Sequence, residues 1–330
     1  MLFNLLTVNH GGMDVPPGVA DLISHMEATL SLCGHDVIIN HNSLIGDGVN
    51  LFFENFVEEA GVQYLIDMKK QNAVKIGIIA TELVLNDQIP YAEHGIQWPE
   101  VAGAPPEYRK DILISKRLHN LGRLVETMDF TWCLLERTAH WYQRRSPSVF
   151  FLPVGSVNHL DENFRRAPKN IDVLFFGTAT PHRIRALTNI QQSGINVVPF
   201  GRGFSDGFMP PIYMNSLLNR AKIGLNLTLH ARDEGDYSGD PRFVSCMRVV
   251  DLFARELCIV SEAIPYDNPY QPYMRSGEIE ELGGICKALL DSGDWAKLGK
   301  DNAHAFRRDM DVRQVCKPII DQTLSRCGWV

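Results

Sequence analysis

The chain has 330 residues, which is more than most single hydrophobic cores contain and predicts two domains of ordinary size. Its 45% hydrophobic and 22% charged residues are typical of a globular protein in water, and no apolar run approaches the roughly 18 residues needed to span a bilayer. The net charge of −7 argues against a general nucleic-acid-binding protein, so we expect no nucleic-acid partner.

Cysteine usage and the N-terminus indicate where the protein works. The seven cysteines are scattered and form no CxxC motif, so we expect neither a disulfide framework nor a zinc knuckle. The N-terminal stretch MLFNLLTVNHGG has neither a basic region nor a small-residue cleavage site, and we interpret it as a first strand rather than a signal peptide. We therefore expect a cytoplasmic protein.

The first half alternates apolar strands with helical stretches. The expected strands cover residues 2–8, 36–40, 49–56, 74–82, 130–136 and 148–155. Helices are expected at about 19–32 and 110–128. Strands that are apolar at nearly every position predict a parallel sheet covered on both faces. Residues 86–108 carry four prolines and are expected to form an irregular excursion, which in compact domains is usually functional or mobile.

The second half restarts the same pattern after a polar crossing at 156–170. Strands are expected at 171–179, 195–201, 223–229 and 258–261, with helices at 181–193 and 241–255 and two more near the end of the chain. The predicted fold is α/β, with two Rossmann-like domains whose parallel sheets face a cleft. The boundaries are 1–155, 156–170 for the crossing and 171–330, and the last helix could return to the N-terminal domain.

Two stretches that follow strands are suited to hold an anion. In the first, a strand runs into Gly177 and Pro181 opens a helix, so backbone N–H groups at the helix start could receive a phosphate with Arg183 beside them. A tight turn with solvated arginines is an equal alternative. In the second, glycines flank Arg202 directly after a strand, which would let the backbone approach a ligand closely.

A third cluster of polar residues lies between 216 and 262. Asn226 and His230 belong to a strand and the loop after it, where open α/β sheets bind ligands. Arg248 stands in the apolar surroundings VSCMRVVDLFA and needs a partner, which is either a ligand diphosphate or Asp251 at helical spacing. Asp251 or Glu262 could accept hydrogen bonds from the two hydroxyls of a ribose.

Candidates for an acid or base lie in the first half. His10 follows the first strand, Glu54 ends FFEN and Glu82 ends IIATE. Each is expected at the carboxyl end of a strand, and an unperturbed histidine suits proton transfer near neutrality. Any one of the three could instead cap a helix or pair with a basic residue.

The segments LLNRAKIGLNLTLH and RVVDLFARELCIVSE resemble the C-terminal half of GT-B glycosyltransferases, most closely the bacterial "glycosyl transferases group 1" and CgeB-like proteins. The resemblance covers about residues 152–309. It implies transfer of a sugar from a nucleotide-sugar donor, held by the C-terminal domain, to a glycan, lipid-linked or protein acceptor, as in bacterial glycan biosynthesis. It also implies no bound metal and no cofactor, because arginines and helix N-termini neutralise the diphosphate.

Two departures from that family stand out. Glu256 occupies the position of the usual glycine in the Ala–x–Gly turn, and the pair of glutamates that marks many retaining members is absent, which leaves retention or inversion open. A nucleotide-sugar epimerase of the same shape and a non-catalytic nucleotide- or sugar-binding subunit remain as alternatives. A lipid acceptor would bring peripheral membrane association, although no amphipathic basic helix predicts it.

Overall fold

The computed structural model describes residues 1–7, 20–41, 43–54, 56, 58–71, 74–85, 87–89, 110–157, 167–201, 203–204, 211–229 and 240–329. These residues form two compact units. The first contains the described residues up to 89, those from 110 to 157 and those from 311 to 329. The second contains the described residues from 167 to 310. Each unit is described by itself.

The first unit is built on a parallel sheet with the strand order β2-β1-β3-β4-β5-β6 within the described residues. Its strands are β1 (Leu2–Leu6), β2 (Asp36–Asn40), β3 (Val49–Phe53), β4 (Lys75–Ala80), β5 (Phe130–Cys133) and β6 (Val149–Phe151). The strands β3 and β5 are buried along their whole length, and β1 and β4 at every position but the first. This matches the expectation that strands apolar at every position form a sheet covered on both faces.

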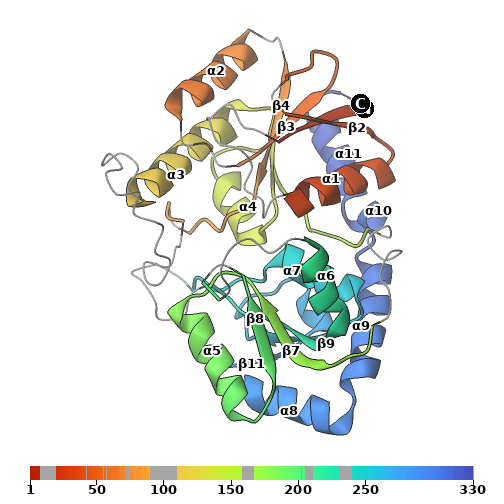
Figure 1. Ribbon diagram of the computed structural model, residues 1–330. Coiled ribbons are helices and arrows are strands. Elements are labelled where there is room, and N and C mark those ends of the chain that lie inside the picture. Colours follow the sequence, from red (N-terminus) through yellow and green to blue (C-terminus); the bar gives the residue numbers. More distant parts are fainter. Residues whose placement is uncertain are drawn as a thin grey trace. The chain divides into compact units, whose positions relative to one another are not determined.

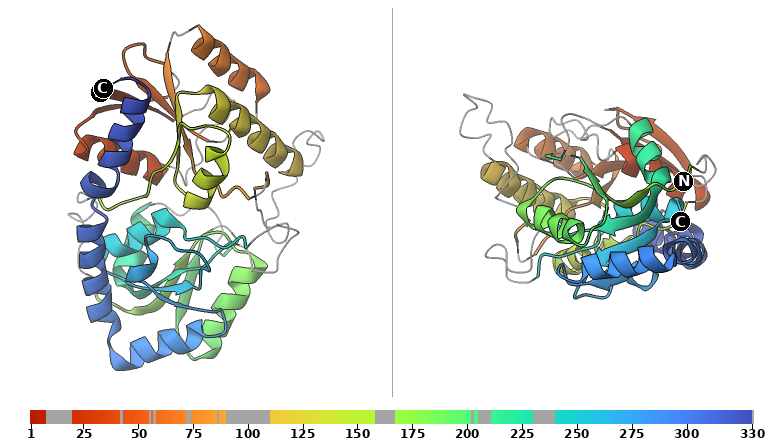
Figure 2. Two further views of the ribbon diagram at one scale, coloured as in Figure 1. Left: turned by 180° about the vertical axis from the view of Figure 1, so that it is seen from behind. Right: turned by 60° about the horizontal axis from the view of Figure 1, so that its bottom comes forward.

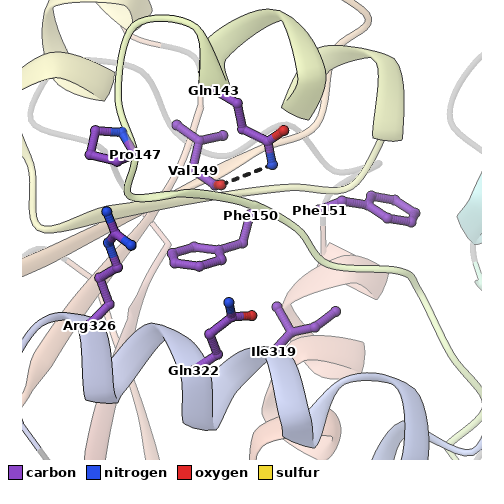
Figure 3. A pocket seen from close by; sticks show the side chains of 8 residues that line it. All are labelled: Gln143, Pro147, Val149, Phe150, Phe151, Ile319, Gln322 and Arg326. Atoms are coloured by element: carbon purple, nitrogen blue, oxygen red, sulfur yellow. Dashed lines mark hydrogen bonds between the residues drawn. The ribbon is translucent and has the colours of Figure 1, made fainter.

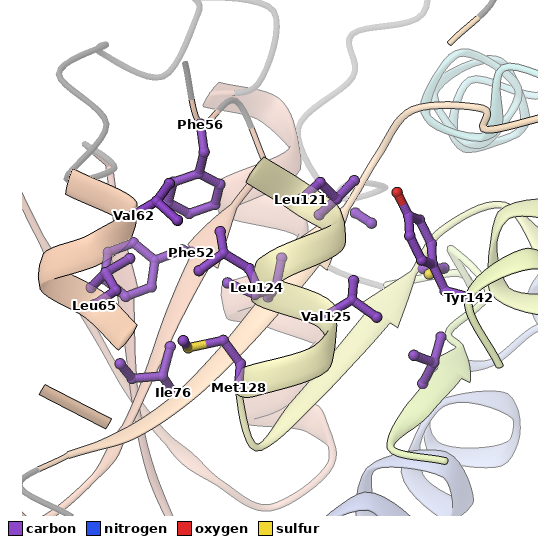
Figure 4. Packing of buried hydrophobic residues seen from close by; sticks show 14 of the residues in the cluster. Phe52, Phe56, Val62, Leu65, Ile76, Leu121, Leu124, Val125, Met128 and Tyr142 are labelled. Atoms are coloured by element: carbon purple, nitrogen blue, oxygen red, sulfur yellow. The ribbon is translucent and has the colours of Figure 1, made fainter. Parts of the chain in front are cut away.

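Helices cover both faces of this sheet (Figure 1). They are α1 (Ala20–Leu32), α2 (Glu59–Lys70), α3 (Lys110–Thr127), α4 (Glu136–Gln143), α10 (Val312–Val315) and α11 (Lys317–Arg326). Side chains of α2 and α3 pack with Phe52 and Ile76 of the sheet in one apolar cluster (Figure 4). Because side chains alternate along a strand, Cys133 joins this cluster whereas Trp132 points the other way. The Trp132 indole Nε1 donates to Thr323 Oγ1 of α11 at 3.0 Å.

The second unit has a parallel sheet with the order β11-β10-β9-β7-β8 within the described residues. Its strands are β7 (Ile171–Phe176), β8 (Val197–Phe200), β9 (Ala221–Asn226), β10 (Cys258–Glu262) and β11 (Arg275–Gly277). The chain passes from β7 to β8 on one side and then returns to β9 on the other side of β7. This reversal makes the carboxyl ends of β7 and β9 a topological switch point, where open α/β sheets bind ligands.

Helices of the second unit also divide between the two faces of the sheet (Figure 2). They are α5 (Pro181–Gln192), α6 (Pro211–Arg220), α7 (Cys246–Ala254), α8 (Leu282–Ser292) and α9 (Trp295–Asp309), with a short 3-10 helix, η4 (Gln271–Tyr273). Helices α5 and α8 share one apolar cluster with the sheet. Helices α7 and α9 pack on each other through Phe253 and Phe306, whose rings stack with centroids 4.5 Å apart.

The structure confirms the predicted α/β fold with two parallel, Rossmann-like sheets. The helix expected from residue 241 begins later, at Cys246. The cause is local: the Asp240 carboxylate accepts hydrogen bonds from the backbone N–H and the Nε of Arg242, both at 3.0 Å. This side-chain-to-backbone turn competes with helix formation. All seven cysteines lie within the described residues and are unpaired.

The turn between α7 and β10 contains Glu256 at the position where the Ala–x–Gly pattern has glycine. Glu256 has a φ of +54°, which is the left-handed conformation that costs a side-chain-bearing residue about 1–2 kcal/mol. Gly299 of α9 packs against this turn, because a Cβ there would lie 2.4 Å from the Glu256 carbonyl oxygen. The turn therefore keeps the backbone geometry of a glycine with a glutamate in place. The Glu256 carboxylate lies 3.6 Å from both His304 and Arg307.

Glycine at this position should be more stable than alanine. Glu256→Gly relieves the left-handed strain, whereas Glu256→Ala keeps it, and both lose the same partly exposed ion pairs, which contribute little. We expect the glycine variant to exceed the alanine variant by about 1 kcal/mol in free energy of unfolding, measured by urea denaturation. Equal stabilities of the two variants would show that the turn is not strained.

Candidate functional site

Polar side chains gather at the switch point of the second unit. Gly177 follows β7, Asn226 ends β9 and Glu262 ends β10. Arg183 and Arg248 reach the same strand ends from α5 and α7, each being the third residue of its helix. The structure thus brings together five of the residues that the sequence predicted for donor binding.

Arg248 is buried, with 7% of its surface exposed. Its Nε donates to the carbonyl of Phe176 at 2.9 Å, and its Nη1 donates to the carbonyl of Leu227 at 3.2 Å and to Asn226 Oδ1 at 3.3 Å. The predicted alternative of a salt bridge with Asp251 does not form. Within the described part of the chain Arg248 meets no carboxylate, and its Nη2 makes no hydrogen bond.

Arg183 is a second buried cation beside the first. Its three guanidinium nitrogens donate to the carbonyls of Thr228, Thr178 and Leu227 at 2.9, 2.9 and 3.1 Å. It also forms no ion pair with any described carboxylate. The guanidinium carbons of Arg183 and Arg248 lie 5.3 and 5.1 Å from the centre of the Phe175 ring.

Keeping these two buried arginines protonated costs free energy, as their lowered pKa values indicate. Burial lowers the pKa of Arg183 to about 10, against a weaker opposing effect of Glu262. Burial lowers the pKa of Arg248 well below its usual value, and the nearby charge of Arg183 lowers it further. Two adjacent positive charges without a neutralising carboxylate favour binding of an anion.

Gly177 leaves room for both guanidinium groups. Its φ is +151°, and a Cβ on it would lie 2.9 Å from Arg248 Nη2 and 3.3 Å from Arg183 Nη1. The neighbouring loop is equally tight, since a Cβ on Gly201 would lie 2.4 Å from the Gly177 carbonyl oxygen. Glycine is therefore required at the strand end where the two arginines converge.

Asn226 connects Arg248, the start of α7 and β10 through hydrogen bonds of its side chain. Its Oδ1 accepts from Arg248 Nη1 and from the backbone N–H of Ser245, both at 3.3 Å. Its Nδ2 donates to Ser261 Oγ at 3.0 Å. The side chain is fully buried, so it positions Arg248 and the start of α7.

The two carboxylates predicted for ribose contact have different surroundings. Glu262 is buried, and its Oε2 lies 2.9 Å from His182 Nε2 and accepts from the backbone N–H of Thr228 at 3.1 Å. Asp251 pairs with Arg255 one helical turn later, at 3.3 Å. Glu262 is thus held by α5 and by the segment that follows β9, whereas Asp251 pairs with the residue that directly follows its own helix.

Three predicted residues, His10, Arg202 and His230, lie outside the described residues. The other two candidates, Glu54 and Glu82, lie at the carboxyl ends of β3 and β4 in the first unit. Glu54 Oε2 accepts the backbone N–H groups of Thr81 and Glu82 at 2.8 and 3.1 Å. Arg117 Nη2 of α3 bridges the two carboxylates, at 2.9 Å from Glu54 and 3.1 Å from Glu82.

Glu54 and Glu82 differ in exposure. The Glu54 side chain is 3% exposed and that of Glu82 is 41% exposed. Burial raises the pKa of Glu54, and Arg117 opposes that shift. Glu54 therefore anchors the backbone after β4, while Glu82 keeps a carboxylate in contact with solvent.

Sequence reasoning missed three residues of these sites: His182, Thr228 and Arg117. His182 follows the helix-opening proline directly, so the start of α5 was a signal for it. Arg117 and Thr228 carry no local signal, since their partners Glu54 and Glu262 are 63 and 34 positions away.

Other features of the described residues lie apart from the switch point. No group of three or more His, Cys, Asp or Glu side chains is arranged there to hold a metal ion, and no described helix has the length and apolar character of a membrane span. A pocket of about 390 Å³ lies in the first unit, between β6 and α11. Figure 3 shows Phe150 facing Gln322 and Ile319 across it. It contains none of the predicted site residues.

Comparison with known proteins identifies the fold. No protein-family profile and no curated protein matches the sequence, but solved structures do. The β-glucosyltransferase (BGT) of T4 phage, in complex with UDP and Mn²⁺, is 13% identical and aligns over 98% of this chain and 99% of its own, with a TM-score of 0.53. AviGT4, a glycosyltransferase involved in avilamycin A biosynthesis, is 10% identical over 100% and 99% of the two chains, with a TM-score of 0.54.

A third similar structure is that of apo OtsA, which is 9% identical over 98% of both chains with a TM-score of 0.53. These alignments span both units, and the sequence identities are too low to carry more than the fold. The chain has the GT-B glycosyltransferase fold.

Proposed function

We propose that the protein is a glycosyltransferase whose second unit binds a nucleotide-diphosphate sugar. The observation that carries the proposal is the buried pair Arg183 and Arg248, neither of which forms an ion pair with a described carboxylate. The pair lies at the switch point, beside the first turns of α5 and α7. A diphosphate supplies the missing negative charge, and the two helix N-termini add backbone dipoles of the right sign.

The same groups would assist the chemistry. Negative charge builds up on the leaving nucleoside diphosphate as its bond to the sugar breaks, and fixed cations in a desolvated site stabilise that charge. Arg248 Nη2 is the donor left for a phosphate oxygen, because Nε and Nη1 are bonded to the protein. We propose that these arginines replace a metal ion. T4 phage BGT has been solved in complex with UDP and Mn²⁺, so activity of this chain in EDTA tests the point.

Glu262 is the carboxylate we propose for the ribose or the donor sugar. Glu262 Oε1 makes no hydrogen bond within the described part of the chain, whereas Asp251 is paired with Arg255. A carboxylate oxygen accepts hydroxyl donors well. Arg202 and His230 remain proposed as further contacts to the donor.

For an inverting reaction we propose Glu82 as the base. Glu54 is committed to two backbone N–H groups and to Arg117, which leaves little capacity to take a proton from an acceptor. Glu82 is partly exposed, and within the described residues its carboxylate is held by one guanidinium contact, to Arg117. His10 stays a candidate from the sequence. The acceptor is proposed to be a glycan, a lipid-linked molecule or a protein.

Removing Arg248 should weaken donor binding. In thermal-shift and calorimetric titrations with UDP, GDP, ADP and CDP in EDTA, the wild type should be stabilised by at least one of them. Arg248→Ala should bind that nucleotide at least tenfold more weakly, since a charged hydrogen bond contributes about 1.5–3 kcal/mol. Arg255→Ala is the matched control, because Arg255 directly follows the last residue of α7 but is already paired with Asp251.

Two results would contradict this part of the proposal. Absence of stabilisation by every nucleotide would contradict a nucleotide-sugar donor. An unchanged affinity in a folded Arg248→Ala variant would contradict the assignment of Arg248.

Replacing Glu82 should slow transfer without weakening donor binding. Glu82→Gln keeps the size of the side chain but cannot take a proton, and a general base contributes about 10²–10⁴-fold to a rate. We expect kcat to fall by about 100-fold or more while the affinity for the nucleoside diphosphate is unchanged. The readout is release of nucleoside diphosphate from the nucleotide sugar, with and without acceptor.

The control is Glu59→Gln, since the Glu59 side chain of α2 is 80% exposed and lies 3.3 Å from Arg123, away from Glu54 and Glu82. Wild-type turnover in Glu82→Gln would remove Glu82 from the mechanism. Conversion of the nucleotide sugar without any release of nucleoside diphosphate would favour an epimerase, and nucleotide binding with no turnover of any sugar would favour a binding subunit.

A further inference from the structure

A buried histidine holds the carboxylate that ends β10. His182 Nε2 and Glu262 Oε2 are 2.9 Å apart, and the two side chains are 1% and 2% exposed. His182 is the second residue of α5, directly after Pro181. The helix start and the strand end are thus joined by one polar contact across the site.

Arg185 determines which nitrogen of His182 donates. Its Nη2 lies 3.4 Å from His182 Nδ1, and a guanidinium can only donate. His182 Nδ1 is therefore the acceptor of this contact. The proton of the ring lies on Nε2, which donates to Glu262 Oε2.

Thr228 completes the set of donors to the same oxygen. Its backbone N–H and its hydroxyl donate to Glu262 Oε2 at 3.1 and 2.7 Å. Oε2 thus receives three donors from two residues, His182 and Thr228. Oε1 receives none within the described residues, so the carboxylate is fixed in orientation with one oxygen uncommitted.

We propose that His182 is a positioning residue that aims Glu262 Oε1 at the ribose diol of the donor, and that the site consequently selects ribonucleotides over dideoxyribonucleotides. The inference rests on the proposed function for its nucleotide. A buried carboxylate oxygen that meets no hydroxyl loses its hydration without replacement, so a ligand that lacks the diol is penalised. A carboxylate free to rotate would lose this discrimination.

The test compares each of UDP, ADP, GDP and CDP with its 2′,3′-dideoxy counterpart by calorimetry. The quantity measured is the ratio of the two dissociation constants for the nucleotide that binds best. Two variants of His182 carry the same amide group at different distances from the backbone. The amide of Gln reaches the position of Nε2, whereas the amide of Asn reaches only that of Nδ1. We expect a ratio of at least ten in the wild type and in His182→Gln, since a hydrogen bond to a charged group is involved.

In His182→Asn and Glu262→Gln the ratio should fall to about three or less, while the dideoxy compound binds as it does to the wild type. A ratio near one in the wild type would overturn the inference and leave the diphosphate site standing. If no nucleotide binds at all, the proposed function itself fails. A folded His182→Asn variant that keeps the wild-type ratio would show that His182 does not position Glu262.

If His182→Asn does not fold, a second pair of variants tests the same arrangement. Thr228→Val removes one donor to Oε2 with little change in volume, and Thr228→Ser keeps it. The ratio should fall in the valine variant and persist in the serine variant. Equal ratios in the two would contradict the three-donor arrangement.

Discussion

The second unit depends on keeping two guanidinium groups buried side by side. Burial of a charge without a partner costs several kcal/mol, and within the described residues the hydrogen bonds of Arg183 and Arg248 go to backbone carbonyls and one amide oxygen rather than to a carboxylate. A cost of this kind is retained where it serves a ligand. The lowered pKa of Arg183, about 10, and that of Arg248 have the same cause, which is desolvation.

The surrounding structure keeps the pair in place. Strand order brings the carboxyl ends of β7 and β9 together, Gly177 provides space, and Asn226 links Arg248 to the start of α7. In the first unit, by contrast, an arginine contacts carboxylates directly. There Arg117 bridges the carboxylates of Glu54 and Glu82, so a single positive charge is shared by two carboxylates, of which Glu82 remains partly exposed.

Much of the fold could be predicted from local sequence. Strands apolar at every position allow only a covered parallel sheet, and a strand followed by Gly177 and a proline-opened helix predicts an anion site. What could not be predicted depends on distant pairing. The roles of Thr228 and Arg117 arise only when strands and helices far apart in sequence meet, as do the contacts of Glu262 with His182 and Thr228, which are 80 and 34 positions away. Glu256 shows the converse, since a family pattern predicted the turn although its glycine is absent.

The most direct measurement is a crystal structure of the protein with a bound nucleoside diphosphate. The account predicts phosphate oxygens at about 3 Å from Arg248 Nη2, beside Gly177 and the start of α5. A nucleotide bound elsewhere, with Arg248 keeping the hydrogen bonds to Phe176, Asn226 and Leu227 that it makes here and none to the nucleotide, would contradict it.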